Sequence, residues 1–548
     1  MIFITILILI VAKALPVLNT NISSVHFFRI ISIVFIVTGF LSFNTLYLET
    51  IGTGIGIYSG LFHVTQISQF IETFFYLIVG LLLIGWPQII TKVNKVKYYL
   101  TDKYSTDYSL IILFSSLGSS LLISSYDLIS LYLSIELQSF GLYVLSTLYR
   151  NSESSTKSGL KYFLLGGLSS AIILLGSGIV YSYTGTTSFE SIYLLNSIND
   201  LSFPLSSLGG TEYFLQGLTL GLLLIFIGFL FKIAAAPLHN WSPDVYDGTP
   251  TIVTMYLTIL PKIAIFMFLL EITTHFGISH GPLNIGSFEI YTSFLVESSI
   301  YKLLLITSIS SLIIGSVLGL SQVKIKRLLA YSTISHIGFI LLALLINTEQ
   351  SIDSFLFYIL QYTITNLNLF LIILALTYTH KMNNLNYISD LKNLFFSNPL
   401  LSLCLCVCLF SMAGIPPLIG FFSKQFVLYA AIQNGFYLTA ILAIIVSVIS
   451  ASYYLKIVKL LISENETFTK IESITENENE NEANSSDLTS SSLSANKDSY
   501  GVLSLIIELT NVHSFIISTL TLILLLFFIK PSLILNSTQL LSLSLFYT

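Results

Sequence analysis

The chain has 548 residues, of which 54% are hydrophobic and only 9% are charged, and its mean hydropathy is +0.85. Soluble domains carry about 25% charged residues. This balance excludes a soluble globular fold and indicates an integral membrane protein that crosses the bilayer many times. The net charge of −5 leaves no basic surface for nucleic acid.

Apolar stretches of about 20 residues, the length of a helix that crosses a hydrocarbon core of about 30 Å, recur along the whole chain. We therefore predict an all-α integral membrane protein with about fourteen transmembrane helices. In chain order the predicted segments lie near 2–18, 27–48, 69–91, 108–125, 127–149, 159–183, 213–246, 249–272, 300–321, 325–347, 354–380, 398–432, 434–462 and 512–530.

Lysine and arginine fall mainly in the loops that follow odd-numbered segments, for example Lys92, Arg150 and Arg327. Loops rich in these residues stay on the side where the chain was made, so we expect them on the inner side and both termini on the outer side. Lysine greatly outnumbers arginine, and isoleucine, phenylalanine and tyrosine are abundant. This usage is typical of an AT-rich genome, which favours a mitochondrial inner membrane; a bacterial plasma membrane is the alternative.

Four charged residues lie inside apolar segments, where a membrane protein tolerates charge least: Glu136, Lys232, Lys262 and Lys424. An ionisable group at the bilayer centre costs about 2.5 to 3.5 kcal/mol even on lenient insertion scales, so its usual explanation is function. We predict that the chain moves ions. The structural alternatives are a neutralising ion pair for Glu136 and a Lys424 side chain that snorkels to the outer surface.

Two segments contain residues that break helices. Pro237 lies inside the seventh segment, and Gly414 with the pair Pro416 and Pro417 lies inside the twelfth. An interior proline costs about 3 kcal/mol, so each segment should divide into two half-helices. Broken helices at corresponding positions in two halves are typical of transporters built from inverted repeats. We predict two inverted five-helix repeats, formed by segments 4–8 and 9–13, with broken helices 7 and 12 as equivalents.

Three polar residues follow the first break, namely His239, Asp244 and Asp247. They are candidates for lining a proton access path on the inner side, although helix capping and loop solvation explain them equally well. The cysteines of the twelfth segment are expected to pack as small apolar residues. We therefore predict no metal site and no disulfide.

Composition divides the chain into six parts. They are an N-terminal three-helix segment (1–107), a first repeat (108–272), an outer connecting loop (273–299), a second repeat (300–462), a polar, acidic, low-complexity inner loop (463–511) and a C-terminal helix with a tail (512–548). We also expect a shorter outer loop over 185–212. The acidic loop buries too little apolar surface to order itself; a regulatory or partner-binding role is the alternative.

Several long strings are similar to motifs of the antiporter-like membrane subunits of respiratory complex I. They are SLYLSIELQSFGLYVL (130–145), LFKIAAAPLHNWSPDVYDGTPT (230–251), LPKIAIF (260–266), QVKIKRLLAYSTISHIGF (322–339) and MAGIPPLIGFFSKQFVL (412–428). The resemblance runs from the fourth segment to the thirteenth. Within the family, one paralogue has glutamate at the position that Lys424 occupies here. Another paralogue has a long lateral helix after its last segment, and we do not expect that helix in the short stretch that follows residue 530 here.

The resemblance implies a role for each charged residue. Glu136 matches the fifth-helix glutamate that pairs with the seventh-helix lysine, here Lys232. Lys262 matches the eighth-helix lysine that connects two half-channels, and Lys424 matches the twelfth-helix lysine. His336, in the string SHIGF, would lie between them on a central polar axis, although an interior histidine is more often structural.

The same resemblance implies the protein's function and setting. It implies a non-redox, proton-translocating subunit in the membrane arm of NADH:ubiquinone oxidoreductase. NADH, FMN, iron-sulfur clusters and ubiquinone would be bound elsewhere in the complex, and the partners would be other membrane-arm subunits, including a neighbouring antiporter-like one, and lipids. Two alternatives stay open: a subunit of a multi-subunit cation/proton antiporter or energy-converting hydrogenase, and a structural spacer without its own proton path.

Overall fold

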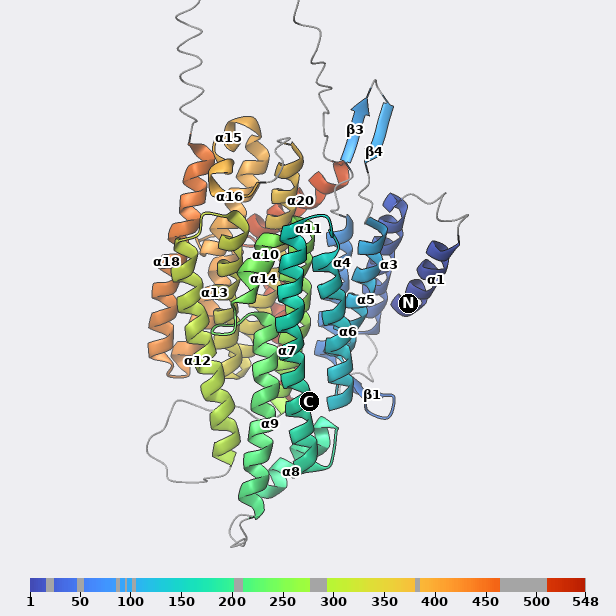
Figure 1. The fold of residues 1–548 in the computed structure, drawn as a ribbon. Helices are drawn as coiled ribbons and strands as arrows, with labels where there is room; N and C mark the ends of the chain where they lie inside the picture. The colour runs from blue at the N-terminus through green and yellow to red at the C-terminus, as the bar shows by residue number, and fades with distance from the viewer. Residues whose placement is uncertain are drawn as a thin grey trace, which may run out of the picture.

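The computed structural model describes residues 1–15, 24–46, 54–84, 89–93, 96–100, 105–201, 210–275, 293–379, 385–463 and 510–547. Over these ranges the protein is predominantly helical, and its long helices run side by side in one bundle (Figure 1). Ten helices in the described ranges are long and apolar enough to cross a membrane. The chain is therefore a multi-pass membrane protein.

The ten long apolar helices are α3 (Ser24–Thr45), α4 (Gln66–Ile84), α6 (Leu128–Thr147), α7 (Glu153–Thr184), α9 (Gly210–Ile233), α11 (Thr251–His275), α12 (Ser293–Leu320), α13 (Ile325–Ile346), α14 (Glu349–Thr379) and α18 (Tyr437–Ile462). Shorter apolar helices are α1 (Ile2–Ala14), α5 (Ser105–Ile123), α16 (Pro399–Ala413) and α20 (Asn511–Leu526). The remaining helices are α8 (Phe189–Leu201), α10 (Trp241–Gly248), the 3-10 turn η2 (Ile388–Leu391), α15 (Leu394–Ser397), α17 (Ile419–Gln433) and α21 (Ser532–Tyr547).

Two antiparallel hairpins accompany the helices. Strand β1 (Ile55–Ile57) pairs with β2 (Phe62–Val64), and β3 (Ile89–Val93) pairs with β4 (Val96–Leu100). The β3–β4 hairpin and α15 lie at one end of the bundle, and β1 and α8 lie at the other (Figure 1). The prediction of a helix over 69–91 is wrong at its end. Helix α4 ends at Ile84, and Ile89–Val93, which is rich in β-branched residues, forms strand β3.

Three expected loops contain helices. Helix α8 occupies part of 185–212, where Phe189 and Ile192 are buried and give the segment an apolar face. Helix α21 occupies the expected tail after 530, and α12 begins at Ser293, within the expected loop 273–299. Of the acidic loop 463–511, residues 464–509 lie outside the described ranges.

The helices differ in how far their neighbours enclose them. Helices α11, α13 and α14 are buried almost completely, whereas α7 and α18 present many large apolar side chains at the protein surface. An apolar helix that is enclosed on all sides belongs to the interior of a bundle. Lys262 on α11 and His336 on α13 therefore lie in the interior of the protein.

Glycines allow the close approach of α12 and α13. A Cβ added at Gly315 of α12 would lie 2.5 Å from the backbone nitrogen of Ser335, and one added at Gly338 of α13 would lie 2.6 Å from Oγ of Ser311. Small residues at such contacts let membrane helices pack backbone against backbone. The same arrangement joins α5 and α6, through Gly118 and Gly141.

We predict that Gly315→Ala destabilises the protein by about 1 to 3 kcal/mol, because the added methyl overpacks a backbone contact. The measurement is the amount of chain in isolated membranes and its thermal midpoint. Gly178→Ala in α7 is the matched control, since nothing lies within 4 Å of a Cβ there. Equal stability of the two variants would contradict the packing described for α12 and α13.

Candidate functional site

The first break separates α9 from α10. Helix α9 ends at Ile233, Ala234 has a left-handed φ of 63°, and Pro237 lies in the irregular stretch before Trp241. A non-glycine residue in this region costs roughly 1 to 2 kcal/mol and persists only where surrounding contacts hold it. One such contact is the indole N–H of Trp241, which donates to the carbonyl of Phe231 at 2.9 Å.

Lys232, in the last turn of α9, faces Glu136 of α6. Their Nζ and Oε1 atoms lie 3.6 Å apart, and both side chains are largely buried, with 8% and 14% exposed. The distance exceeds that of a hydrogen bond, and neither atom has another hydrogen-bond partner among the described residues. The two side chains therefore form an ion pair slightly longer than a hydrogen bond.

A small cavity of about 20 Å³ adjoins Lys232. Its polar lining includes Gln138 and Ser139 of α6, Tyr143 and Tyr162. Both side-chain polar atoms of Gln138 are buried and have no partner among the described residues. A site of this polarity and size can hold about one water molecule.

Lys262 lies in the middle of α11 and is 3% exposed. Its Nζ donates to the hydroxyl of Tyr362 at 3.2 Å, and that hydroxyl donates to the carbonyl of Thr258. The rings of Tyr246 and Tyr362 lie 5.8 and 5.6 Å from the ammonium. Two tyrosine rings and one hydroxyl thus lie around this cation.

His336 of α13 lies near the polar groups around Lys262. Its Nδ1 shares a hydrogen bond of 2.7 Å with the hydroxyl of Tyr358, and its ring lies 6.0 Å from the ring of Tyr362. Both tyrosines belong to α14, four residues apart, and so project from one face of that helix. Tyr362 therefore contacts both Lys262 and His336.

Lys424 lies at the second break. Helix α16 ends at Ala413, Gly414 caps it with a left-handed φ of 85°, and Pro416 and Pro417 precede α17. The Nζ of Lys424 donates to the carbonyls of Met412 and Ala413 at 3.0 and 2.9 Å.

The side chain of Lys424 is buried, so it does not snorkel toward a surface. Its ammonium lies 5.7 Å from the ring of Phe339, which stacks on Tyr358 at 5.9 Å. Tyr358 is the tyrosine that bonds His336. Aromatic contacts therefore run from Lys424 to the neighbourhood of His336.

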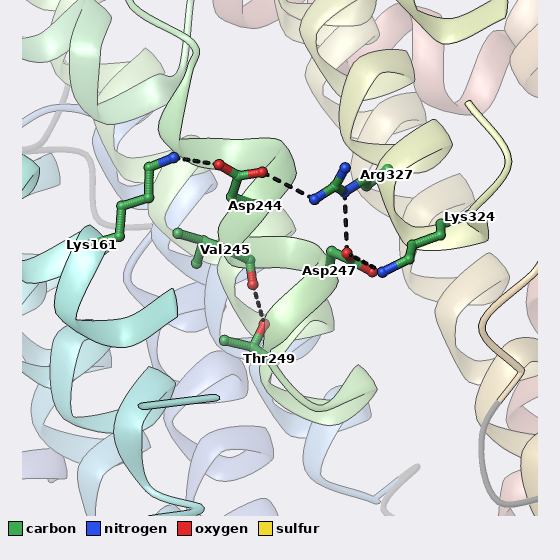
Figure 2. Close-up of polar contacts among 7 residues, drawn as sticks. All are labelled: Lys161, Asp244, Val245, Asp247, Thr249, Lys324 and Arg327. Carbon is green, nitrogen blue, oxygen red and sulfur yellow. Dashed lines mark hydrogen bonds and ion pairs between the residues drawn. The ribbon is translucent and has the colours of Figure 1, made fainter. Parts of the chain in front are cut away.

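Asp244 and Asp247, on α10, take part in ion pairs. Asp244 lies between Lys161 of α7 and Arg327 of α13, and Asp247 accepts from Lys324 at 2.8 Å and from Arg327 at 3.1 Å (Figure 2).

His239 is buried in the break, with its Nδ1 3.2 Å from the carbonyl of Pro237. Its ring lies 6.3 Å from the ring of Tyr331 on α13.

The predicted residues form two groups. Glu136 and Lys232 contact each other, while Lys262, His336 and Lys424 are joined through tyrosines and Phe339. Tyr358 and Tyr362, which join the second group, were not predicted. The available signal was the density of polar residues in the apolar run of α14, which carries Gln361, Thr365, Asn366 and Asn368 near these tyrosines.

Among the described residues no group of three or more histidine, cysteine, aspartate or glutamate side chains is arranged to hold a metal ion. The three cysteines are unpaired, and Cys408 accepts a hydrogen bond from Asn368.

We predict that Tyr358→Phe lowers the stability of the protein by about 1 to 3 kcal/mol, because it removes the partner of a buried imidazole nitrogen. The thermal midpoint of the purified protein measures the effect. Tyr437→Phe is the control, since Tyr437 is 63% exposed. An unchanged midpoint for Tyr358→Phe would show that the hydrogen bond to His336 contributes nothing.

Known proteins are similar to this chain in sequence and in fold. Residues 125–450 match the family model described as NADH:quinone oxidoreductase/Mrp antiporter, transmembrane. The chain is 45% identical to NADH-ubiquinone oxidoreductase chain 2 of Rhizopus oryzae, over 97% of this chain and 98% of the relative. It is 37% identical to NADH-quinone oxidoreductase subunit N of Paramagnetospirillum magneticum, over 65% of this chain and 68% of the relative.

A solved structure shares the fold. A chain of the membrane-bound sulfane sulfur reductase, an archaeal respiratory membrane complex, superimposes with a TM-score of 0.75 over 98% of this chain and 96% of that chain, at 20% identity. The resemblance to antiporter-like subunits of complex I is thus confirmed, and the chain belongs to the NADH:quinone oxidoreductase/Mrp antiporter family of membrane subunits.

Proposed function

We propose that this chain translocates protons as a core membrane-arm subunit of NADH:ubiquinone oxidoreductase. The observation that carries the proposal is the row of buried ionisable groups Glu136, Lys232, Lys262, His336 and Lys424. Protons would pass along this row while electron transfer from NADH to ubiquinone takes place elsewhere in the complex. Charged groups at this depth are otherwise too costly to retain.

The Glu136–Lys232 pair would load and release a proton. At 3.6 Å and an effective dielectric constant near 20, the attraction between the two charges is about 4 to 5 kcal/mol. At about 7 Å it falls to roughly 2.4 kcal/mol. A small separation of the pair would therefore change the free energy of protonating Lys232 by about 2 kcal/mol, enough to change its proton occupancy more than tenfold.

The centre of the row would relay the change. Tyr362 contacts both Lys262 and His336, and Tyr358 bonds His336 beside Phe339, which faces Lys424. A change of charge at one of these sites alters the preferred charge of the next. Coupling would thus pass along the row through electrostatics, without a moving solute.

We further propose that about fourteen helices form two inverted repeats, at segments 4–8 and 9–13. Each proposed repeat begins with a glycine-packed helix pair, α5 with α6 and α12 with α13. Each contains a helix interrupted near a lysine, at Pro237 and at Gly414, Pro416 and Pro417. These correspondences support a common ancestry of the two halves.

The proposed setting is the mitochondrial inner membrane, with both termini on the outer side. The fungal relative named above is a ubiquinone-linked chain, while the bacterial relative leaves a plasma membrane as the alternative. Partners would be other membrane-arm subunits, including a neighbouring antiporter-like one, and lipids. NADH, FMN, iron-sulfur clusters and ubiquinone would be bound by other parts of the complex.

The alternatives receive less support. An antiporter or hydrogenase subunit would share the fold, but the relatives that cover most of this chain carry complex I names. A passive spacer would have no need of three buried lysines. Co-purification distinguishes these hypotheses. Association with a large NADH-oxidising assembly supports complex I, whereas a small complex that confers sodium tolerance supports the antiporter.

We predict that Lys232→Met leaves the complex assembled and lowers NADH-driven proton uptake by about tenfold or more, because the charge switch at Glu136 is lost. The measurement is proton uptake by membrane vesicles, normalised to assembled complex. Normal uptake in an assembled Lys232→Met variant would refute the assignment of this pair.

Lys262→Met and Lys424→Met, made separately, test the spacer alternative. A relay predicts that each variant loses proton uptake in the assembled complex, whereas a spacer tolerates both at full turnover. Lys302→Met is the control, because this lysine lies exposed on α12 away from the row.

A further inference from the structure

Helix α10 lies between the two lysines of the first half of the chain. Tyr246, near its end, faces the ammonium of Lys262 at 5.8 Å. Trp241, at its start, lines the cavity beside Lys232 and lies 6.3 Å from Tyr246, ring to ring. This eight-residue helix thus contacts both lysine environments, as does α11, whose Pro261 also lines the cavity.

The other face of α10 carries charge. Asp244 and Asp247 are three residues apart and share that face. They form the α10 ion-pair cluster, which comprises Lys161, Asp244, Asp247, Lys324 and Arg327 (Figure 2). Arg327 contacts both aspartates and belongs to α13, the helix that carries His336 nine residues later, or about 13 Å along the axis.

Helices α12 and α13 also hold the backbone on either side of α10. The hydroxyl of Ser310 on α12 donates to the carbonyl of Ala236 at 2.7 Å, and Lys326 on α13 donates to the carbonyl of Thr249 at 2.7 Å. Both ends of the segment that contains α10 are therefore tied to these two helices. The ion pairs fix its middle.

The free energies of these ion pairs favour a role in positioning α10 over a role in stabilising the fold. Lys161, Asp244, Lys324 and Arg327 are each 38 to 44% exposed, and exposed ion pairs contribute about 0 to 1 kcal/mol each. A cation–π contact, by contrast, requires the ammonium to lie within about 6 Å of the ring centroid. At 5.8 Å, the Lys262–Tyr246 contact lies near the outer limit of this range, so a movement of α10 away from α11 weakens it.

We infer that the α10 ion-pair cluster positions α10 against α13, and so sets the aromatic surroundings of Lys262 and Lys232 together. Asp247 and Arg327 are positioning residues that act through Tyr246 and Trp241. The inference rests on the proposed proton-translocating function and names residues outside the row of buried charges. A shift of α13 would be transmitted by Arg327 to the half-helix that follows Lys232.

The test is Asp247→Asn and Arg327→Gln, singly and together, in membranes that contain the complete complex. We expect each single variant to lower kcat for NADH-driven quinone reduction about 3- to 10-fold per assembled complex, with KM for quinone unchanged. The kcat of the double variant should be no lower than that of the less active single variant, because both substitutions remove the contact between Asp247 and Arg327. Arg327→Lys keeps the charge and should retain more than half of the wild-type kcat.

Lys459→Gln is the matched control, since Lys459 is an exposed lysine of α18 outside the cluster, and it should leave kcat unchanged. Full turnover in both single variants, or multiplied losses in the double variant, would overturn the inference. If Lys232→Met abolishes proton uptake while the cluster variants turn over normally, the inference fails and the proposed function stands. If Lys232→Met also pumps normally, the proposed function fails first.

Discussion

A lysine lies beside the C-terminal end of a half-helix at each of the two breaks, and the arrangement of the interior depends on how its charge is compensated. The last carbonyls of a helix lack intrahelical partners and carry partial negative charge. Lys232 occupies the last turn of α9, and Lys424 reaches back from α17 to the carbonyls of Met412 and Ala413. At the second break the helix end thus supplies acceptors that make a buried cation tolerable, and the ammonium satisfies two carbonyls that should not stay unpaired in an apolar interior. At the first break the carboxylate of Glu136 compensates Lys232.

The central helices join Lys262, His336 and Lys424 through their aromatic side chains. Helices α11, α13 and α14 are enclosed on nearly all sides. Their polar groups therefore meet one another in place of lipid or solvent, as Tyr362 does with Lys262 and His336. In a medium of low effective dielectric constant, such contacts transmit a change of charge more strongly than they would near a surface. The same burial that makes the charges costly makes them responsive to one another.

The sequence predicted those parts of the site that break a local rule. A charge in an apolar run, as at Lys262, and a proline inside a helix, as at Pro237, are each visible without a fold. Tyr358 and Tyr362 were missed because a tyrosine in an apolar helix is equally at home in a core. The contacts of Asp244 with Arg327 and of Ser310 with Ala236 join residues more than 70 positions apart, and one sequence holds no information on such pairings. Helices α8 and α21 were missed because hydropathy over a span of about 20 residues cannot detect short helices outside the membrane-spanning segments.

Proton translocation along the proposed row requires a path between the Glu136–Lys232 pair and Lys262, and the cavity lined by Gln138 and Tyr162 lies beside that pair. The most direct measurement is a high-resolution map of the complete complex in which ordered waters are visible. If protons move along this path, we expect a water in this cavity within hydrogen-bond distance of Lys232, and further waters leading past Trp241 and Tyr246 to Lys262. A dry, apolar gap between the two lysines in every state of the working complex would contradict it.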